Sequence, residues 1–311
     1  MSKAIELYGQ QAKERRQRAG EWIVENLVRI SGISAIVFVV LVFFFLIREG
    51  LPAFWQVQPG NLFGTKWYPT FGFFGILPLI CGSLLVTVGA IVIALPLGIA
   101  TAIYMRELAP GWLREILKPL VEILAGIPSV VLGFLGMVAV APLLRTWLDM
   151  PTGLSAFAGA LMLAYMALPT IISVADDAID AVPKSYRDAA LALGANHWQT
   201  IWRVVLPAAR SGVLIGVMLG IGRAIGETMA VMMVTGNAAR MPDGLLAIFQ
   251  PARTMTATIA AEMGEVANGS THYHVLFAVG IVLFVITFLI NALASVLMVR
   301  SGPRRGGQLL G

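Results

Sequence analysis

Two residues of opposite charge stand four positions apart inside an otherwise apolar stretch. Arg223 and Glu227 lie in the run from Gly222 to Val231, which reads GRAIGETMAV. On a helix, this spacing places both side chains on one face, where they can pair. A guanidinium also suits phosphate-like oxyanions, because its fork donates two parallel hydrogen bonds. The pair therefore either locks one helix against another or meets an anion in transit, and we favour the role in a path or gate.

The segment 183–207 carries a second group of informative residues, which are Asp188, Ala189, Ala190, Gly194, Val204, Leu206 and Pro207. Pro183 suits the first turn of a helix, and Gly194 can adopt the left-handed conformation that ends one. A second short helix, 197–205, is expected to stop at Leu206-Pro207, because proline cannot continue the hydrogen-bond ladder. The segment therefore predicts a helix–glycine–helix elbow whose small alanines face outward, where another surface can dock.

Motifs for nucleotide, metal or cofactor chemistry are missing from the sequence. No GxxxxGK[ST] motif occurs, so we expect no nucleotide-binding loop in this chain. His272 and His274 lie in a loop without cysteine or paired carboxylates, so no metal site and no cofactor are predicted. Asp176, Asp177 and Asp180 precede the elbow, and we expect them to cap and solvate the end of a helix and not to bind a cation.

The composition is that of a membrane protein. Apolar residues make up 58% of the chain and charged residues 13%, against roughly 45–50% and 25% in soluble domains. The mean hydropathy is +0.82, and the single cysteine, Cys81, leaves no internal disulfide framework. The net charge of +5 comes from short basic clusters beside apolar runs, which is typical of membrane orientation. We therefore expect contact with membrane lipid and no binding of nucleic acid.

Six segments are long and apolar enough to cross the hydrocarbon core, which takes about 20 residues of helix. They are 30–47, 76–104, 123–144, 155–174, 211–235 and 275–299. The first lacks a small-x-small cleavage site, so we expect an uncleaved anchor and not a signal peptide. The predicted fold is an all-α polytopic membrane protein with six transmembrane helices.

Lysine and arginine set the orientation of these spans. Of the 22 basic residues, sixteen fall on the side of the N-terminus, five on the other side, and Arg223 lies within a span. Because cytoplasmic loops carry the positive charge, both ends of the chain and the elbow are predicted to be cytoplasmic. The expected parts are a cytoplasmic arm, 1–29, a transmembrane domain, 30–299, and a cytoplasmic tail, 300–311.

This assignment places Arg223 and Glu227 near the middle of the bilayer. A charge there costs about 3 kcal/mol even on lenient insertion scales, so both side chains should face protein or a water-filled path. Gly212, Gly216 and Gly220 repeat at i,i+4 in the same span and offer a smooth face against which another helix can pack.

The elbow resembles a loop of a known family of transporters. Asp188-Ala189-Ala190, Gly194 and Val204-Val205-Leu206-Pro207 have the spacing of the cytoplasmic "E-A-A … G … I-x-L-P" loop in the membrane subunits of ABC-type importers. Asp188 stands where the family usually has Glu, and Val204 where it has Ile. The resemblance implies that the loop docks into an ATPase subunit and transmits its closure to the pore.

A narrower resemblance runs across most of residues 72–299, the core of the transmembrane domain. The run from Arg223 to Val231, followed by Thr235-Gly236-Asn237, is similar to the fifth span of phosphate-specific importer permeases of the PstC type. The run from Ala125 to Gly133 is similar to their third-span entry, and Pro96 to Tyr104 resembles a second-span exit shared more widely. The sister subunit of the PstA type shares the Arg-Ala-Ile-Gly-Glu-Thr element, but Met-Ala-Val after it and the long N-terminal arm favour PstC.

The resemblance implies a subunit of the bacterial cytoplasmic (inner) membrane that carries phosphate by alternating access. Its expected partners are a homologous permease of the PstA type, two ATP-binding subunits and an extracytoplasmic phosphate-binding protein. The chain itself is then not an enzyme, because ATP hydrolysis belongs to its partner, and Arg223 and Glu227 are the residues expected in the path or gate.

Three alternatives stay open at this point. The chain could be the sister permease, or a permease for another oxyanion such as phosphonate, sulfate or molybdate. A different class of protein, a self-gated channel or a membrane sensor scaffold, would have to work without an ATPase.

Overall fold

The computed structural model describes the backbone of residues 2–301 and the side chains of residues 21–296, apart from Ile23 and Leu245. The predicted tail beyond residue 301, which includes Arg304 and Arg305, lies outside the described residues, as do most side chains of the predicted arm, 1–29.

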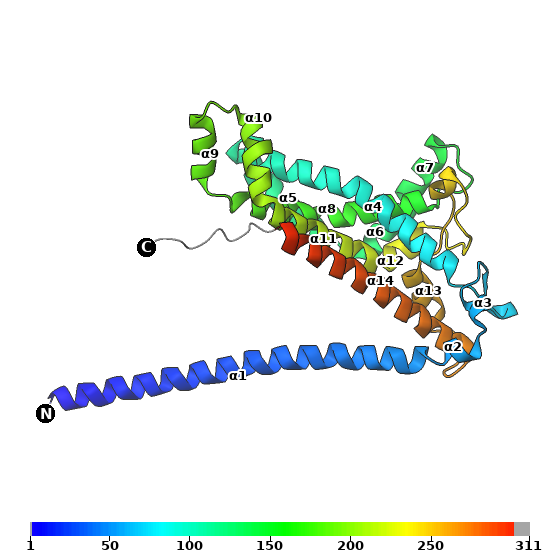
Figure 1. Ribbon diagram of the computed structural model, residues 1–311, viewed down its shortest axis with the longest axis horizontal. Coiled ribbons are helices and arrows are strands. Elements are labelled where there is room, and N and C mark those ends of the chain that lie inside the picture. Colours follow the sequence, from blue (N-terminus) through cyan, green and yellow to red (C-terminus); the bar gives the residue numbers. More distant parts are fainter. Residues whose placement is uncertain (1, 302–311) are drawn as a thin grey trace.

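Within residues 2–301, the regular secondary structure is helical apart from one small hairpin and an isolated bridge between Gly236 and Ala252 (Figure 1). The helices of the first half are α1 (Ser2–Gly50), α2 (Ala53–Gln56), α3 (Pro59–Leu62), α4 (Leu77–Ile103), α5 (Gly111–Ala125), α6 (Ser129–Leu135) and α7 (Ala141–Trp147). Those of the second half are α8 (Ala156–Asp180), α9 (Lys184–Ala192), α10 (His197–Thr200), α11 (Leu206–Gly226), α12 (Met229–Val234), α13 (Met255–Glu262) and α14 (Thr271–Ser301). Strands β1 (Trp67–Tyr68) and β2 (Phe73–Phe74) pair antiparallel, with Trp67 opposite Phe74.

Five short helical turns of other types complete the chain. Two are 3₁₀ turns, η1 (Pro69–Phe71) and η5 (Leu245–Phe249). Three are π turns that continue α-helices: η2 (Tyr104–Leu108), η3 (Gly136–Val140) and η4 (Ile201–Val205).

Six helical stretches have the length and composition to cross a membrane, which confirms the predicted six-span fold. Spans one to six are Val24–Gln56, Leu77–Leu108, Ser129–Trp147, Ala156–Asp180, His197–Gly226 and Thr271–Val296. The start of α1, the end of α14 and the elbow helices α9 and α10 lie at one end of the molecule, which we call the elbow end (Figure 1). This agrees with an even number of crossings.

Span four forms the centre of the molecule, because α8 packs against both α4 and α11. Small residues make these contacts close. A Cβ added at Gly98 of α4 would lie 2.7 Å from Ile171 Cγ2, and one at Gly220 of α11 would lie 2.6 Å from Ile171 Cγ1. Gly216 faces Val174 in the same way, so the predicted glycine face is confirmed as the surface of α11 that packs on α8.

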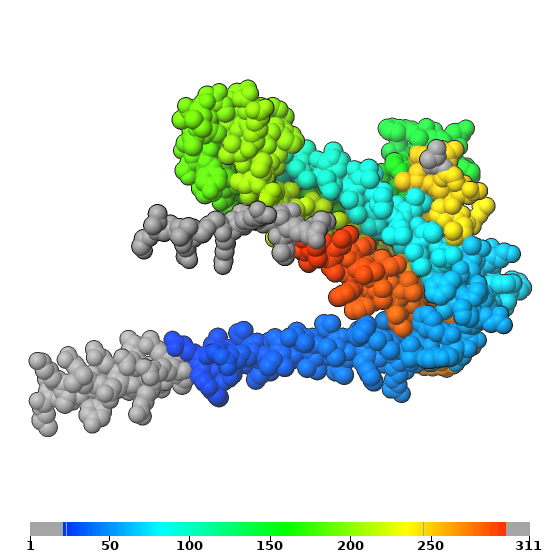
Figure 2. Space-filling model, in the orientation of Figure 1, coloured from blue at the N-terminus to red at the C-terminus, as the bar shows by residue number. Residues whose placement is uncertain are grey.

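Span one stands apart from this core. Helix α1 diverges from the other helices in Figure 1, and the space-filling view shows an open wedge between the coloured part of α1 and α14 (Figure 2). Contacts with α14 gather near the C-terminal end of α1, where the ring centroids of Phe43 and Phe284 are 4.8 Å apart and an added Cβ at Gly50 would meet Ile281.

Exposed tryptophans mark the two ends of the spans. Trp112, Trp198 and Trp202 lie on α5, α10 and η4 toward the elbow end, whereas Trp55 and Trp147 lie on α2 and α7 toward the other end. Indole rings favour the headgroup region, because they are apolar in body and carry one polar N–H. The tryptophans therefore bracket the apolar part of the molecule.

Span five differs from its predicted bounds, 211–235, at both ends. It begins at His197, because the helix does not stop at Leu206-Pro207 but runs through η4 into α11. A π turn supplies a wider helical turn just before Pro207, which has no N–H to donate and would crowd an ordinary α turn. The same arrangement precedes Pro142, where η3 leads into α7. The predicted stop at Pro207 was therefore wrong.

Span five also ends earlier than predicted. Helix α11 stops at Gly226, and Glu227 has an extended backbone, with φ −71° and ψ 132°. A separate helix, α12, follows after Thr228. The hydroxyl of Thr256, on α13, donates to the carbonyl of Glu227 over 3.0 Å and helps to hold this break in place.

Candidate functional site

The predicted helix–glycine–helix elbow is present in residues 183–207. Helix α9 ends before Gly194, whose φ of +85° is the left-handed conformation expected there. Helix α10 begins with a capping box, in which the Asn196 side chain accepts from the Gln199 backbone and the Gln199 side chain accepts from the Asn196 backbone. This Asn-x-x-Gln signal is readable in the sequence and was missed.

The outer surface of the elbow is partly apolar. Leu193 stands at its tip with 89% of its surface exposed. Asp188, Ala189 and Gly194 are also exposed. Ala190 is buried, so the expectation that both alanines face outward was wrong for this residue. Consecutive helical positions point about 100° apart, so Ala190 turns inward while α9 packs against η4. The remaining predicted residues are half-buried at Val204 and Leu206 and exposed at Pro207.

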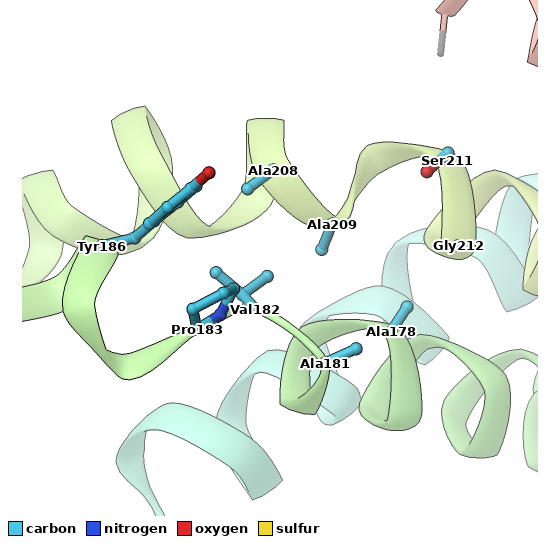
Figure 3. A pocket seen from close by; sticks show the side chains of 9 residues that line it. All are labelled: Ala178, Ala181, Val182, Pro183, Tyr186, Ala208, Ala209, Ser211 and Gly212. Carbon is cyan, nitrogen blue, oxygen red and sulfur yellow. The ribbon is translucent and has the colours of Figure 1, made fainter. Parts of the chain in front are cut away.

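A cavity of about 310 Å³ lies beneath the elbow (Figure 3). Its lining is mostly small side chains from the end of α8, the start of α11 and the connection between α8 and α9. Tyr186 of α9 reaches over it toward Ala208 (Figure 3). Tyr186 therefore lies over open space, whereas Ala190 of the same helix is buried.

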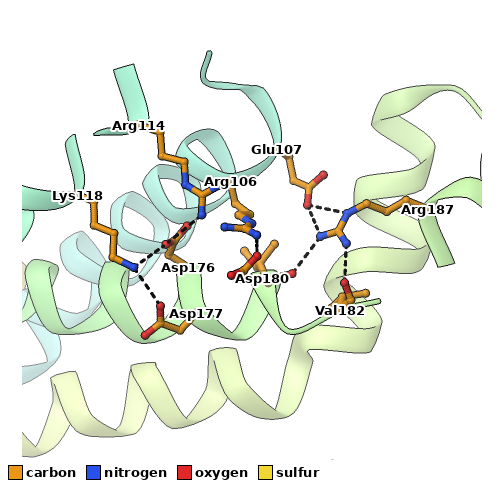
Figure 4. A network of polar contacts seen from close by, with 10 residues as sticks. Arg106, Glu107, Arg114, Lys118, Asp176, Asp177, Asp180, Val182 and Arg187 are labelled. Carbon is orange, nitrogen blue, oxygen red and sulfur yellow. Dashed lines mark hydrogen bonds and ion pairs between the residues drawn. The ribbon is translucent and has the colours of Figure 1, made fainter. Parts of the chain in front are cut away.

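Charged side chains gather between the elbow and the ends of spans two and four (Figure 4). This elbow-side charge cluster consists of Arg106, Glu107, Arg114, Lys118, Asp176, Asp177, Asp180 and Arg187. Arg106 pairs with Asp180, and Lys118 Nζ lies 3.5 Å from Asp177 Oδ1. The cluster therefore joins η2 and α5 to the last turns of α8.

The three aspartates of this cluster do not all behave as predicted. Asp177 and Asp180 have substantially exposed side chains, but only 3% of the Asp176 side chain is exposed. Arg114 Nη2 and Lys118 Nζ each lie 4.0 Å from Asp176 Oδ2, and Asp176 Oδ1 is buried without a hydrogen-bond partner among the described residues. Asp176 is thus a buried carboxyl group between two cations, and the expectation that it is solvated was wrong.

Arg187 makes the densest set of hydrogen bonds in the cluster. Its Nε and Nη2 donate to Glu107 Oε1 over 3.1 and 2.7 Å. Its Nη1 donates to the carbonyl of Val182 over 2.7 Å, and Nη2 also donates to the carbonyl of Ile179 over 3.0 Å. One guanidinium therefore ties α9 to the π turn at the end of span two and to the end of span four. Sequence analysis missed this residue, because its partner Glu107 is 80 positions away.

Arg223 and Glu227 do not form the predicted pair. Arg223 Nη1 donates to Thr170 Oγ1 and Nη2 to the carbonyl of Ala125, both over 3.4 Å. Glu227 Oε1 instead accepts from the backbone N–H groups of Met229 and Ala230, over 3.1 and 3.3 Å. No ion pair joins the two side chains in the part of the chain that the structure describes. The i,i+4 rule fails because the helix ends between them, at Gly226.

The break leaves the two charges in different settings. Glu227 caps the start of α12, which satisfies N–H groups that have no partner within the helix. Arg223 is half-buried where α11, α8 and the end of α5 meet, and its two hydrogen bonds are longer than the usual 2.9–3.0 Å. A loosely held guanidinium at a helix break can exchange its present acceptors for an oxyanion.

A second set of polar contacts lies near the hairpin of β1 and β2, at the end of the molecule opposite the elbow (Figure 1). Glu262 accepts from Arg253 and Trp67, and His272 Nε2 lies 2.8 Å from Glu262 Oε2. His274 Nδ1 lies 2.7 Å from the carbonyl of Glu49. These contacts hold the outer segments together. Among the described residues, no group of three or more histidine, cysteine, aspartate or glutamate side chains has the arrangement of a metal site.

Comparison with known proteins gives consistent results. Residues 94–306 match the family described as binding-protein-dependent transport system inner membrane component. The chain is 44% identical over 230 residues to a probable ABC transporter permease protein, YqgH, of Bacillus subtilis strain 168, which covers 73% of this chain and 74% of that protein. It is 40% identical over 264 residues to the phosphate transport system permease protein PstC of Mesorhizobium japonicum, covering 79% and 80%.

A solved structure shares the same arrangement of helices. A chain of the bacterial alginate ABC transporter, in complex with a periplasmic protein bound to an alginate pentasaccharide, superimposes with a TM-score of 0.61 and covers 86% of this chain and 92% of its own. The identity is 16%, so this likeness concerns the fold.

Proposed function

Because the chain belongs to the binding-protein-dependent transport system inner membrane components, a family of multi-pass ABC importer permeases, we propose that its substrate is inorganic phosphate. Its partners are then a homologous permease of the PstA type, two ATP-binding subunits and an extracytoplasmic phosphate-binding protein. The relative named as a phosphate permease, 40% identical over 79% of this chain, supports this choice.

The observation that carries the proposal is the position of Arg223. It is a cation in the last turn of α11, where a membrane span is broken, and both of its hydrogen bonds are long. A charge at this depth is costly unless it has a partner, and a planar fork of donors matches the oxygens of phosphate. Phosphate passing the break replaces Thr170 and the Ala125 carbonyl as the acceptor of Arg223.

Glu227 displaces the phosphate from Arg223 during transport. In the described state its carboxylate is occupied by the first N–H groups of α12. When the break between α11 and α12 rearranges, the carboxylate leaves this cap and approaches Arg223. An anion held by Arg223 is then repelled and leaves the site, because like charges in a low-dielectric interior interact strongly.

The elbow supplies the driving movement. Its exposed surface around Asp188, Ala189 and Leu193 docks into an ATP-binding subunit, and closure of the ATPases moves it. The basic asymmetry of sixteen against five residues supports a cytoplasmic position for this surface. A reporter that is active only outside the cytoplasm and is fused after Gly311 is expected to be silent, and activity there would overturn this orientation.

Uptake by the assembled importer tests the substrate. The permease, its sister subunit, the ATP-binding subunits and the binding protein are reconstituted in vesicles, and uptake of radioactive phosphate is measured against excess sulfate, molybdate or phosphonate. We expect competition by unlabelled phosphate alone. Preferential competition by another oxyanion would assign the chain to that substrate, and uptake without ATP would indicate a channel.

A further inference from the structure

Arg187 is held more tightly than an exposed docking helix requires. It lies next to Asp188 in the middle of α9, yet 81% of its side chain is covered, since 19% is exposed. It makes four hydrogen bonds to three acceptors, and Glu107, which accepts two of them, has a side chain only 6% exposed. A buried ion pair with further hydrogen bonds is a stiff connection, because breaking it leaves a charge without a partner in a dry environment.

The three acceptors belong to two different spans. Glu107 lies in η2, the π turn that ends span two, and Ile179 and Val182 lie at the end of α8 and just beyond it. The neighbouring ion pair of Arg106 with Asp180 joins the same two segments. Arg187 therefore adds the first elbow helix to a connection that already exists between spans two and four (Figure 4).

The other arm of the elbow is built differently. Helix α10 continues into span five through the π turn η4, with Pro207 just beyond it. Such turns are sites where a helix can bend, because the regular hydrogen-bond ladder is interrupted. The cavity between the ends of α8 and α11, beneath Tyr186, also leaves room for the start of α11 to move. η2 is also a π turn, but Arg187 and Arg106 tie it to α9 and α8, whereas no side-chain hydrogen bond or ion pair braces η4 among the described residues. The elbow thus has one arm that is braced, through Arg187, and one arm that is free to bend, at η4.

We propose that Arg187 is a positioning residue that makes α9, the end of span two and the end of span four move as one unit, while span five bends at η4. The proposal rests on the docking role of the elbow given above. Movement of the docked elbow then reaches the interior through spans two and four together, and α8 carries it toward Thr170, an acceptor of Arg223.

A bridging experiment tests this directly. Cysteines replace Glu107 and Arg187 in a Cys81→Ala background, the whole importer is reconstituted, and phosphate transported per ATP hydrolysed is measured. Without a bridge, we expect this ratio to fall about tenfold while ATP hydrolysis persists, as for loss of a coupling contact. A bifunctional thiol reagent with a flexible spacer should restore the ratio, whereas a monofunctional reagent should not.

Two results would overturn the proposal. An unchanged ratio before bridging would show that the connection is not needed, and a bridged importer that cannot transport would show that α9 and span two must separate. If the double-cysteine permease does not assemble, Arg187→Gln and Arg187→Lys replace it. We expect Arg187→Gln to lower the phosphate transported per ATP hydrolysed, and Arg187→Lys, which retains the charge, to lower it less. If both variants had the same ratio as the unmodified importer, the proposal would also be refuted.

Matched variants separate this proposal from the docking role itself. Arg145→Gln removes an exposed cation from α7, outside the elbow and the charge cluster, and should leave the ratio unchanged. Gly194→Leu disturbs the elbow at its turn. If Gly194→Leu uncouples the importer and Arg187→Gln does not, the elbow docks but Arg187 transmits nothing. If neither does, the docking role has failed as well.

Discussion

The two arginines at the functional ends of this permease use the same chemical group in opposite ways. Arg187 is surrounded by close acceptors at 2.7–3.1 Å and a buried carboxylate. Arg223 has two acceptors at 3.4 Å, and the carboxylate four positions away is engaged elsewhere. The proposed role of Arg187 in transmitting movement rests on its many short bonds, and the proposed role of Arg223 in binding phosphate rests on its few long ones. The two proposals therefore differ in contact geometry and not in residue type.

The largest effect is expected at the loosely held arginine. Arg223→Gln should lower phosphate uptake by roughly a hundredfold or more, the size seen when a preorganised donor to a charged group is removed. Arg223→Lys, which keeps the charge but not the planar fork, should lose less. Vesicle uptake together with the amount of assembled complex measures both.

The double variant decides whether Arg223 and Glu227 serve only each other. We expect Glu227→Gln and Arg223→Gln/Glu227→Gln to assemble and to transport as poorly as the single arginine variant. If instead the double variant alone regained uptake, the two residues would form a structural pair, because only a lone buried charge would then be harmful.

A smaller effect is expected at the turn of the elbow. Gly194→Leu places a side chain in the left-handed region, at a cost of about 1–2 kcal/mol, although the surrounding space is open. Docking geometry changes, so phosphate transported per ATP should fall by about tenfold while the protein stays in the membrane. Gly111→Leu, another exposed glycine with open space around it but without a positive φ, is the control. Equal uptake by both variants would remove the elbow from the coupling path.

The smallest effect concerns two adjacent aspartates in the elbow-side charge cluster. Asp176→Asn should change the free energy of unfolding of the purified complex by about 1 kcal/mol, because the side chain of Asp176 is buried between two cations. Asp177→Asn should stay within about 0.5 kcal/mol, since its carboxylate is two-thirds exposed and its ion pair with Lys118 is screened by water. Equal shifts in melting temperature would contradict the difference in burial.

The sequence predicted the features that depend on local pattern. Hydropathy located the six spans, and the glycine at position 194 located the turn of the elbow. The repeat of Gly212, Gly216 and Gly220 correctly identified a packing face, because small residues at helical spacing have the same effect wherever the partner lies.

The features that the sequence did not predict depend on contacts between distant residues or on irregular backbone. Arg187 finds its acceptor 80 positions away, so its role has no local signal. The break after Gly226 separates Arg223 from Glu227, although the run around them reads as continuous helix. Proline at position 207 was read as a stop, because the π turn that accommodates it is not visible as a pattern.

The π turn η4 also sets the direction in which the elbow faces. An α-helix advances about 100° around its axis with each residue, so one residue more or less in a turn rotates everything before it by that angle. Deleting a single residue from Ile201–Val205 would let the helix regularise and swing α10 to a different azimuth relative to span five. We expect the permease still to fold and cross the membrane, but α10 would meet α9, which Arg187 ties to α8 and η2, at a different angle. The angle between the two elbow helices, and with it the shape of the proposed docking surface, therefore depends on the presence of a single residue in η4.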